Sequence, residues 1–447
     1  MSHNFLTYKI ADTIKRTAKI EPELFSQYGV KRGLRNENGS GVLVGLTRIG
    51  NVVGYEEAED GSIFPVPGRL LYRGYDVNTI VDSVVSEHRF GYEEVAYLLL
   101  SGSLPDAEEL EQFRLLLVEN MPLPHEAVMS ILTLRGTNVM NILARSVLEL
   151  YNYDESPDDM SRENMMAQSI SLIAHFPTII AYAYNGLIHH TKGLPLHIRL
   201  PNPELSYAEN FLYMLKNEYS ELEARTLDQL LILQAEHGGG NNSTFTVRVT
   251  SSTQTDMYSS IAAAIGSLKG PLHGGANLKL SSMFDHLKGV ITDWQDKNEI
   301  RSYLKRMLDK EVFDQTGLIY GIGHAVYTIT DPRAEILRPI ARELAAEKDR
   351  VRELEFMELV EREAIELVSS HKSGNKATSN VDFWTGFLYD MIQVPQEIIT
   401  PIFAMARCVG WAAHRNEELT FSGRRIIRPA YRDVGETSAS YIPLQER

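Results

Sequence analysis

Apolar residues recur at intervals of three and four along most of this chain, which is the spacing of one face of an α-helix. One clear helix start is Asp106, which precedes Glu109 by three residues as in a capping box. A second helix is expected over residues 258–269, where Gly270-Pro271 ends the pattern. Helices and strands do not alternate, so a doubly wound sheet of the dinucleotide-binding kind is not expected. The pattern predicts a mainly α protein.

One convincing β signal lies near the N-terminus, where residues 47–55 and 62–72 flank an Asp-Gly turn at residues 60–61. Two prolines in the second arm restrict it to an edge or irregular strand. Residues 333–370 carry many charges, with apolar residues at helical intervals, and predict a solvated helical segment. We therefore expect a small N-terminal β-hairpin region on an otherwise helical protein.

Composition argues against several classes of function. A formal net charge of −15 is unlike a general nucleic-acid binder, which presents a basic face, although local arginines could still hold small anions. No apolar run approaches the roughly 18 residues that a membrane span needs, and the N-terminus has no signal-peptide core. The single cysteine, Cys408, excludes an intrachain disulfide and suits a reducing compartment. A cytoplasmic protein is expected.

Three histidines stand in glycine-rich breaks: His237 in Glu-His-Gly-Gly-Gly, His273 in Gly-Pro-Leu-His-Gly-Gly and His324 in Gly-Ile-Gly-His. Glycine lets a backbone approach a ligand closely, and histidine exchanges protons near neutral pH. A fourth break, at residues 380–383, supplies the carboxylate of Asp382. We expect the four breaks to assemble one site from loops.

Local motifs for cofactors, metals and esterase chemistry are incomplete. Gly321-Ile322-Gly323 begins like a dinucleotide fingerprint, but Val326 stands where the third glycine is required. The glycines after His237 resemble an esterase oxyanion loop, yet the chain has no Gly-x-Ser-x-Gly elbow. The histidines lack the paired spacing of a structural zinc site, and there is no phosphate-binding Walker sequence. No metal and no bound cofactor are expected.

In their order and spacing, the breaks together resemble the citrate synthase family, which includes the 2-methylcitrate synthases. The resemblance extends back to residues 72–75 and covers nearly the whole chain. The segment from His324 to Arg333 is its most specific part. The other matching pieces are Glu236-His237 with Asn242-Ser243-Thr244, Gly270-Pro271-Leu272-His273-Gly274-Gly275-Ala276-Asn277, Asn380-Val381-Asp382-Phe383, Arg407 and Arg428-Pro429.

The resemblance implies condensation of an acyl-CoA with oxaloacetate, as in the tricarboxylic acid cycle, followed by hydrolysis of the citryl-CoA thioester. A carboxylate removes a proton from a weakly acidic methyl group while a donor stabilises the enolate oxygen. Asp382 is similar to the family's base, and His273 to its enol-stabilising donor. His324 matches the donor to the ketone oxygen, which becomes an alkoxide. His237 matches the residue that binds and polarises oxaloacetate.

Oxaloacetate is a dianion, and its carboxylates call for guanidinium partners. Arg333, Arg407 and Arg428 match the family's oxaloacetate-binding arginines, and the last of these reaches in from the other subunit of a dimer. The resemblance thus implies an obligate homodimer with a shared site. Acetyl-CoA is a substrate rather than a cofactor, and no metal is needed beside these cations.

Four features depart from many family members. Gln234 stands where many have histidine, Gly238 where many have glutamate, and Thr385 where a serine often follows the base. The loop after His324 lacks the basic residue that meets the CoA phosphates in many members, so other cations are expected there. The candidate CoA contacts are Gly321, Ile322, Gly323, Lys372 and Lys376.

The resemblance also implies two helical domains. Residues 1–275 and 391–447 would form the large domain, and residues 276–390 the small domain that closes over the cleft. Two alternatives stay open: a 2-methylcitrate synthase that accepts propionyl-CoA, and a non-catalytic relative. One extra methylene is worth only about 1–3 kcal/mol of discrimination, and no residue in the sequence locates that preference. Allosteric control and assembly beyond a dimer are equally undetermined by the sequence.

Overall fold

The computed structural model describes residues 2–36, 39–60, 62–216, 218–324, 326–371, 377–435 and 440–446. The chain divides into two compact units. The main unit consists of Thr47–Ile426, and the terminal unit combines Met1–Leu46 with Ile427–Arg447.

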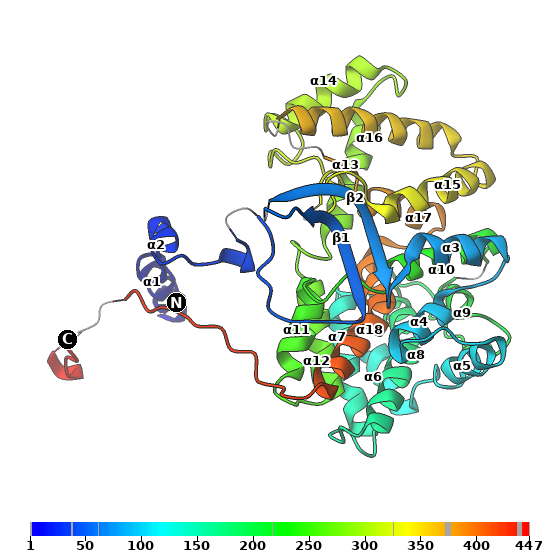
Figure 1. Cartoon of the computed structure of the whole chain (residues 1–447), viewed down its shortest axis with the longest axis horizontal. Coiled ribbons are helices and arrows are strands. Elements are labelled where there is room, and N and C mark those ends of the chain that lie inside the picture. The colour runs from blue at the N-terminus through cyan, green and yellow to red at the C-terminus, as the bar shows by residue number, and fades with distance from the viewer. Residues whose placement is uncertain are drawn as a thin grey trace. The chain divides into compact units, whose positions relative to one another are not determined.

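Helices dominate the main unit, which confirms the mainly α fold (Figure 1). Its α-helices are α3 (Val77–Ser86), α4 (Tyr92–Ser101), α5 (Ala107–Glu119), α6 (His125–Thr133), α7 (Val139–Leu150), α8 (Arg162–Lys192), α9 (Tyr207–Leu215), α10 (Glu221–Gln234), α11 (Asn242–Ser251), α12 (Met257–Leu268), α13 (Ala276–Val290), α14 (Lys297–Leu308), α15 (Pro332–Glu347), α16 (Val351–His371), α17 (Val381–Met391) and α18 (Gln396–Thr420). A 3-10 turn, η2 (Tyr151–Tyr153), follows α7.

The predicted hairpin is present as β1 (Gly50–Glu57) and β2 (Ile63–Tyr72), which pair antiparallel with an irregularity between Val53 and Tyr55. A two-residue strand, β3 (Tyr75–Asp76), pairs with the far end of β2. Pro65 and Pro67 of β2 lie in the half of the strand that pairs with β1 on one side and with no described strand of this sheet on the other. This half is therefore an edge, where a proline is tolerated. Gly61 of the predicted turn lies outside the described residues.

Local helix signals were informative, with one difference. The capping box of Asp106 and Glu109 is present at the start of α5, and α12 coincides with the helix predicted over residues 258–269. The charged segment at 333–370 forms two helices instead of one, because the chain breaks between α15 and α16. Asp349 lies in this break with a φ of 55°, a left-handed conformation that interrupts a right-handed helix.

Two long helices, α8 and α18, run through the core and pack against each other. By length and composition α8 could cross a membrane, but 72% of its apolar window is buried inside the protein. A helix that is apolar on all sides is typical of such a buried position. Polar residues are nevertheless buried on α18, among them Arg407, His414 and Arg415. Their burial shows that α18 contributes more than apolar packing.

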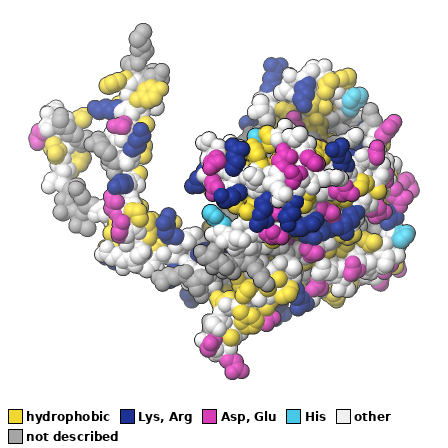
Figure 2. Space-filling model, turned by 90° about the horizontal axis from the view of Figure 1, so that it is seen from above, with side chains coloured by type: hydrophobic (Ala, Val, Ile, Leu, Met, Phe, Trp, Pro, Cys, Tyr) yellow, Lys and Arg dark blue, Asp and Glu magenta, His cyan; other side chains and the backbone are white. Residues whose placement is uncertain are grey.

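Helices α13 to α17 pack mainly with one another and form one group within the main unit (Figure 1). The face of this unit seen in Figure 2 mixes acidic and basic side chains. Ion pairs between the helices of this group include Arg301 with Glu366 and Arg342 with Glu358, as expected for a solvated surface. The domain boundaries at 275/276 and 390/391 remain a prediction.

The terminal unit contains α1 (Ser2–Thr17), α2 (Pro22–Gln27) and the 3-10 turns η1 (Arg32–Leu34) and η3 (Leu444–Glu446). Its two chain ends contact each other where the guanidinium of Arg432 lies 4.8 Å from the ring centre of Tyr28. None of its described residues is buried. The terminal unit therefore has no hydrophobic core of its own.

Candidate active site

Arg407 lies on α18 with its side chain completely buried. Its Nε donates to the carbonyl oxygen of Gln234 at the end of α10, at 2.6 Å. Its Nη1 and Nη2 have no hydrogen-bond partner among the described residues. Burial lowers the pKa of Arg407 to about 10, although the carboxylate of Glu236 opposes this shift. Arg407 therefore presents two unsatisfied donors inside the protein.

His237 follows α10 in the glycine-rich loop, and its ring centre lies 5.3 Å from that of His324. Burial lowers the pKa of His237 well below its usual value, and the charges of Arg333, His324 and Arg407 lower it further. The ring is thus neutral at physiological pH. Its Nε2 is buried and has no partner in the described part of the chain. The ring of Tyr327 contacts both His237 and Arg333, with its centre 5.7 Å from the His237 ring centre and 5.7 Å from the Arg333 guanidinium.

His324 is held in a defined orientation by its own loop. Its Nδ1 accepts hydrogen bonds from the backbone N–H groups of Val326, at 3.1 Å, and Tyr327, at 3.0 Å. The ring of Tyr327 stacks on it at 4.8 Å between centres. Because Nδ1 is an acceptor here, a neutral His324 carries its proton on Nε2. That nitrogen is the one that can donate to a substrate oxygen.

The β1–β2 hairpin supports the loop that follows His324. The backbone N–H of Gly68 donates to Thr330 Oγ1 at 3.1 Å. A Cβ atom at Gly54 would collide with the carbonyl oxygen of Val326, and one at Gly68 with that of Thr330. Glycine is required at both positions because the strands approach the loop backbone so closely.

Arg333 occupies the first turn of α15 and is almost completely buried. Its Nε and Nη2 donate to the two carboxylate oxygens of Asp331, at 3.0 and 2.8 Å. Asp331 Oδ2 also accepts the backbone N–H of Val381, at 3.1 Å, and so joins α15 to α17. Burial opposes the charge of Arg333, but Asp331 raises its pKa above the usual value. Arg333 is thus already paired with a carboxylate, unlike Arg407.

Asp382 lies in the first turn of α17 after the helix-capping residue Asn380. Its Oδ1 accepts a hydrogen bond from Asn277 Nδ2 at 2.8 Å, and Thr385 Oγ1 donates to Asn277 Oδ1 at 3.0 Å. Burial raises the pKa of Asp382 to about 6, while the charge of Arg333 opposes the rise. A carboxylate with this pKa is ionised at pH 7 yet basic enough to take a proton.

His273 lies in the loop between α12 and α13. Its Nε2 is 3.1 Å from Ser243 Oγ, which also accepts from Trp411 Nε1 at 3.2 Å. Burial lowers the pKa of His273 to about 4, and the charge of Arg407 adds to this effect. His273 is therefore neutral near pH 7. A neutral imidazole can still donate a hydrogen bond to a developing enolate oxygen.

Mutual electrostatic effects show that six predicted site residues meet in the main unit. Arg407 affects both His237 and His273, and Arg333 affects His237 and Asp382. The segment Gly321-Ile322-Gly323 bonds to residues 378–380, directly before Asp382. Two predictions fall elsewhere. Arg428 is exposed and belongs to the terminal unit. Lys372 and Lys376 lie outside the described residues.

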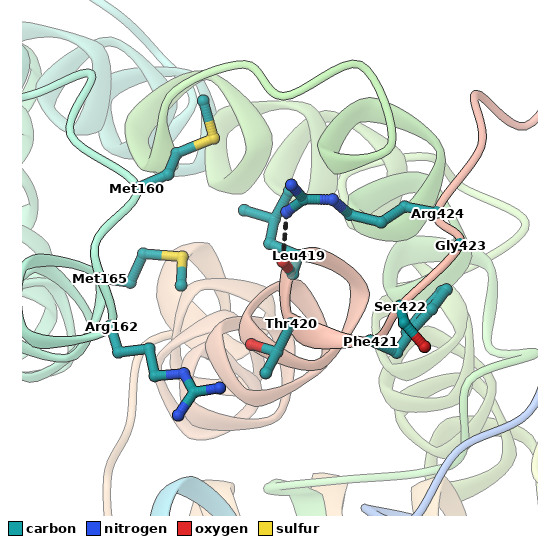
Figure 3. Close-up of a pocket in the computed structure, with 9 residues that line it drawn as sticks. All are labelled: Met160, Arg162, Met165, Leu419, Thr420, Phe421, Ser422, Gly423 and Arg424. Carbon is teal, nitrogen blue, oxygen red and sulfur yellow. Dashed lines mark hydrogen bonds between the residues drawn. The ribbon is translucent and has the colours of Figure 1, made fainter.

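A hollow of about 490 Å³ at the C-terminal end of α18 contains none of the predicted site residues (Figure 3). Arg424 lies beside it, with Nη1 donating to the carbonyl of Leu419, while Arg162 points away from Arg424. The two guanidinium groups therefore do not converge on one ligand position. Within the described residues, no group of three or more His, Cys, Asp or Glu side chains could hold a metal ion.

Comparison with known proteins agrees with this geometry. A family model described as "Citrate synthase, C-terminal domain" matches residues 38–430. This chain belongs to the citrate synthase family. The citrate synthase of Deinococcus radiodurans is 37% identical over 359 residues, which cover 80% of this chain and 88% of that protein. A 2-methylcitrate synthase of Shewanella oneidensis is 32% identical over 85% of this chain and 92% of its own length.

Solved structures of the citrate synthase family share the fold. That of citrate synthase from Thermotoga maritima has a TM-score of 0.73 and 30% identity, covering 94% of this chain and 99% of that chain. A ternary complex of citrate synthase from Thermoplasma acidophilum with carboxymethyl coenzyme A and oxaloacetate has a TM-score of 0.76 and 26% identity. This similarity covers 94% of this chain and 99% of the Thermoplasma chain. The predicted family resemblance and the all-helical fold are confirmed.

The structure adds residues to which the family motifs gave no role. Asn277 contacts the expected base, Asp331 pairs with an expected substrate arginine, and Ser243 contacts His273. All three stand inside the motifs that carried the family resemblance. The partners of Asn277 and Ser243 are distant in sequence, so no local spacing indicates these two contacts, whereas Asp331 and Arg333 are only two residues apart.

Proposed function

We propose that the protein condenses acetyl-CoA with oxaloacetate and hydrolyses the resulting citryl-CoA to citrate and CoA. The observation that carries this proposal is Arg407, fully buried with both Nη atoms unpaired in the described residues, near the unpaired Nε2 of His237. An unpaired buried donor costs about 1–3 kcal/mol, so native proteins rarely retain several of them in one place. A dianionic substrate would satisfy both Nη groups of Arg407 and, with the proton of the neutral His237 ring on Nε2, this nitrogen as well.

In the proposed complex, Arg407 binds one carboxylate of oxaloacetate through its two Nη atoms. Arg333 approaches the other carboxylate while Asp331 keeps its guanidinium plane fixed. His237 binds and polarises the substrate. The Nε2–H of His324 donates to the ketone oxygen, where negative charge develops as the new bond forms. The backbone donors to His324 Nδ1 favour the tautomer that this step requires.

Asp382 is proposed to remove a proton from the methyl group of acetyl-CoA while His273 donates to the thioester oxygen. The carbanion carbon then attacks the ketone carbon of oxaloacetate, and the ketone oxygen becomes an alkoxide that His324 protonates. Water subsequently attacks the citryl thioester, and the C–S bond breaks to release CoA and citrate. One water proton goes to the departing CoA thiolate and the other restores His324, while Asp382 releases the proton it took to solvent. Asn277 holds one oxygen of Asp382, which leaves Oδ2 as the atom that takes the proton.

We further propose that residues 276–390 form a small domain that opens and closes on a large domain of residues 1–275 and 391–447. The buried position of Arg407 supports this idea, because oxaloacetate can reach its Nη atoms only if surrounding elements move. Asp382, His324 and Arg333 would move with the small domain. Closure after oxaloacetate binds would exclude water from the site and complete it for acetyl-CoA.

A homodimer with a shared site is the assembly that we propose. The terminal unit leaves large apolar side chains exposed, including Phe5 at 74%, Tyr431 at 95% and Tyr441 at 83%. Such surface is stabilised by burial at roughly 25 cal/mol per Å², and contiguous exposed apolar area is typical of an interface. A second copy is the proposed partner, because this unit also carries Arg428, an expected ligand of oxaloacetate.

Mixed dimers test the shared site. A subunit with Arg428→Ala and a subunit with Asp382→Asn should each be inactive as pure dimers. Mixed dimers should regain part of the activity, since one of their two sites contains both intact residues. Absence of any complementation, with mixing verified by mass spectrometry, would contradict a site that is shared between subunits.

The remaining expectations are proposals of the same kind. CoA would contact Gly321, Ile322 and Gly323, and Lys372 and Lys376 would supply the cations that the loop after His324 lacks. No cofactor or metal would take part in the reaction. The enzyme would act in the cytoplasm, at the citrate-forming step of the tricarboxylic acid cycle.

The decisive experiment measures CoA release with oxaloacetate and either acetyl-CoA or propionyl-CoA. A higher kcat/KM for acetyl-CoA supports the proposal, and a higher value for propionyl-CoA would assign the alternative 2-methylcitrate activity, for which the Shewanella relative is a precedent by name. No CoA release with either thioester would favour a non-catalytic relative. The control is Asp382→Asn, which must abolish any activity assigned to this site.

A further inference from the structure

Glu236, the residue directly before His237, lies in a buried row of polar groups behind the site. Its Oε1 is 2.8 Å from His414 Nε2, and both side chains are completely buried. On the far side of this histidine, Arg248 Nη2 lies 2.7 Å from His414 Nδ1. Arg248 also pairs with Glu418 at 2.8 Å and with Glu417. The row connects the histidine loop with α11 and α18.

The contact with Arg248 determines which nitrogen of the His414 ring accepts a hydrogen bond. A guanidinium group has donors only, so His414 Nδ1 must accept the hydrogen bond from Arg248. The proton of a neutral His414 is then on Nε2 and is donated to Glu236 Oε1. His414 thus has one accepting and one donating nitrogen, each with a partner. A side chain without both functions cannot replace it.

Glu236 transmits this arrangement to the backbone around His237. The same Oε1 atom accepts a hydrogen bond from the backbone N–H of Gly238. The Glu236 side chain is thus bonded to the backbone on the far side of His237 and fixes the conformation of this short turn. Gly238 has a φ of 81°, which only glycine adopts without strain. Burial raises the pKa of Glu236, and the largest opposing cause is the charge that a protonated His414 would carry. The hydrogen bonds from His414 and Gly238 and the charge of Arg407 also lower this pKa, and these causes remain with a neutral His414 ring. The acceptor therefore stays ionised.

One helix carries both groups that oxaloacetate would require on this side of the site. Arg407 and His414 are seven residues apart on α18, which places them on the same face two turns apart. Arg407 would bind the substrate directly, whereas His414 reaches it only through Glu236 and the loop. The position of His237 relative to the guanidinium of Arg407 is thereby fixed by a single rigid element.

We propose that His414 is a positioning residue for oxaloacetate binding: it holds the Glu236 carboxylate, which sets the direction of His237 against Arg407. The proposal rests on the function proposed above. It assigns no contact between His414 and either substrate, and it concerns affinity for oxaloacetate rather than for acetyl-CoA.

The experiment compares three variants of the full-length enzyme. In His414→Gln, the amide can donate to Glu236 and accept from Arg248, so both hydrogen bonds are retained in type. His414→Asn has the same groups on a side chain one methylene shorter, and His414→Leu has neither. The matched control is His175→Leu, which changes a half-buried histidine of α8 that takes no part in this row and whose pKa is lowered to about 4 by its surroundings.

We expect His414→Leu to raise the KM for oxaloacetate by on the order of tenfold to a hundredfold, since small misplacements in a site have effects of this size. The KM for acetyl-CoA should change less than twofold. His414→Gln should restore most of the affinity for oxaloacetate, and His414→Asn should not. His175→Leu should leave both KM values as in the wild type, even if it lowers the thermal midpoint.

Two results would overturn the proposal. The first is a folded His414→Leu enzyme with a wild-type KM for oxaloacetate. The second result, which decides the matter if His414→Leu does not fold, is an equal KM for oxaloacetate in His414→Gln and His414→Asn. Wild-type enzyme is assayed in parallel, and its failure to release CoA from acetyl-CoA and oxaloacetate would reject the proposed function instead. Failure of the two proposals is therefore distinguishable.

Discussion

The candidate site has two walls, α18 with Arg407 and α15 with Arg333, and the two buried arginines differ in how they are paired. On α18, Arg407 uses only its Nε within the described residues and leaves both Nη atoms without a partner. On α15, Arg333 is bound at two points by Asp331, two residues earlier in the chain. Accordingly, the pKa of Arg407 is lowered to about 10 by burial, whereas Asp331 raises that of Arg333.

This difference separates a binding role from a supporting one. Removing a charge from water is costly unless a partner compensates it, so the α18 wall is destabilised until an anion arrives. The α15 wall is compensated already, and Asp331 additionally joins α15 to α17, which carries Asp382. The first wall is thus prepared for oxaloacetate, and the second keeps the base in place.

The largest expected effect comes from removing the base of the second wall. Asp382→Asn should lower kcat by about a thousandfold, within the usual range for a general base, with little change in thermal midpoint. Steady-state kinetics and thermal unfolding measure the two quantities. The matched control is Asp390→Asn at the exposed end of the same helix, which should retain normal turnover. Near-normal turnover of Asp382→Asn would reject the assigned base.

Replacing each arginine by methionine should change stability in opposite directions. Arg407→Met should raise the thermal midpoint of the ligand-free protein, because a buried charge that Glu236 compensates only in part is lost, and should raise the KM for oxaloacetate by about a hundredfold. Arg333→Met should lower the midpoint, because breaking a buried pair typically costs about 3–5 kcal/mol. Differential scanning calorimetry measures both.

Ligand-induced stabilisation sharpens this comparison. Oxaloacetate should raise the midpoint of the wild-type protein, since a ligand that binds only the folded state stabilises it. It should have little effect on Arg407→Met. If the two arginine variants shift the ligand-free midpoint in the same direction, the contrast between the walls is wrong.

The pKa of Asp382 predicts opposite pH trends for activity and stability. The pKa of Asp382 in the folded protein, about 6, lies above the usual aspartate value of 3.8, so folding favours the protonated carboxyl. Its contribution to stability is therefore fully present below pH 3.8 and is lost as the pH rises through about 6. Activity requires the ionised base, so kcat/KM for acetyl-CoA should fall about tenfold per pH unit below pH 6. A pH profile flat down to pH 5 would contradict this pKa.

The smallest effect is expected at Thr385, which supports Asn277 behind the base. Thr385→Val keeps the size but loses the hydroxyl, and one hydrogen bond is worth about 0.5–1.5 kcal/mol, or roughly a threefold to tenfold change in rate. Thr385→Ser retains the hydroxyl and should stay within twofold of the wild type. Equal kcat values for the valine and serine variants would show that Asn277 needs no such support.

The helical class was predictable because it depends on repeated short-range spacing. The apolar intervals and the capping box at Asp106 each involve neighbours within one or two turns. The break between α15 and α16 was not predicted. The three residues between the helices are Lys348, Asp349 and Arg350, and none of them is the glycine or proline that usually marks a helix end. The break depends on Asp349 adopting a left-handed conformation, with the backbone N–H of Arg350 donating to the carbonyl oxygen of Ala345 at 2.8 Å, and the residue types alone do not indicate this helix end.

The site was predictable in its reacting residues and not in their supports. His237, His273 and Asp382 stand in glycine-rich or helix-capping breaks that form recognisable motifs. His414 stands in no motif, and its partner Glu236 is 178 residues away along the chain. The one sign was the seven-residue spacing of Arg407 and His414 around the mostly apolar stretch 398–413 of α18, because buried polar residues need partners.

The close approach of the hairpin to the loop after His324 has a consequence for how this chain can vary. Gly54 and Gly68 touch no substrate in the proposed complex, yet a single methyl group at either would displace the backbone next to His324. If all substitutions at each position were tested for activity, these two glycines would therefore be as intolerant as the catalytic residues, unlike their neighbours on the same strands. Their intolerance would reflect the shape of the chain and not its chemistry.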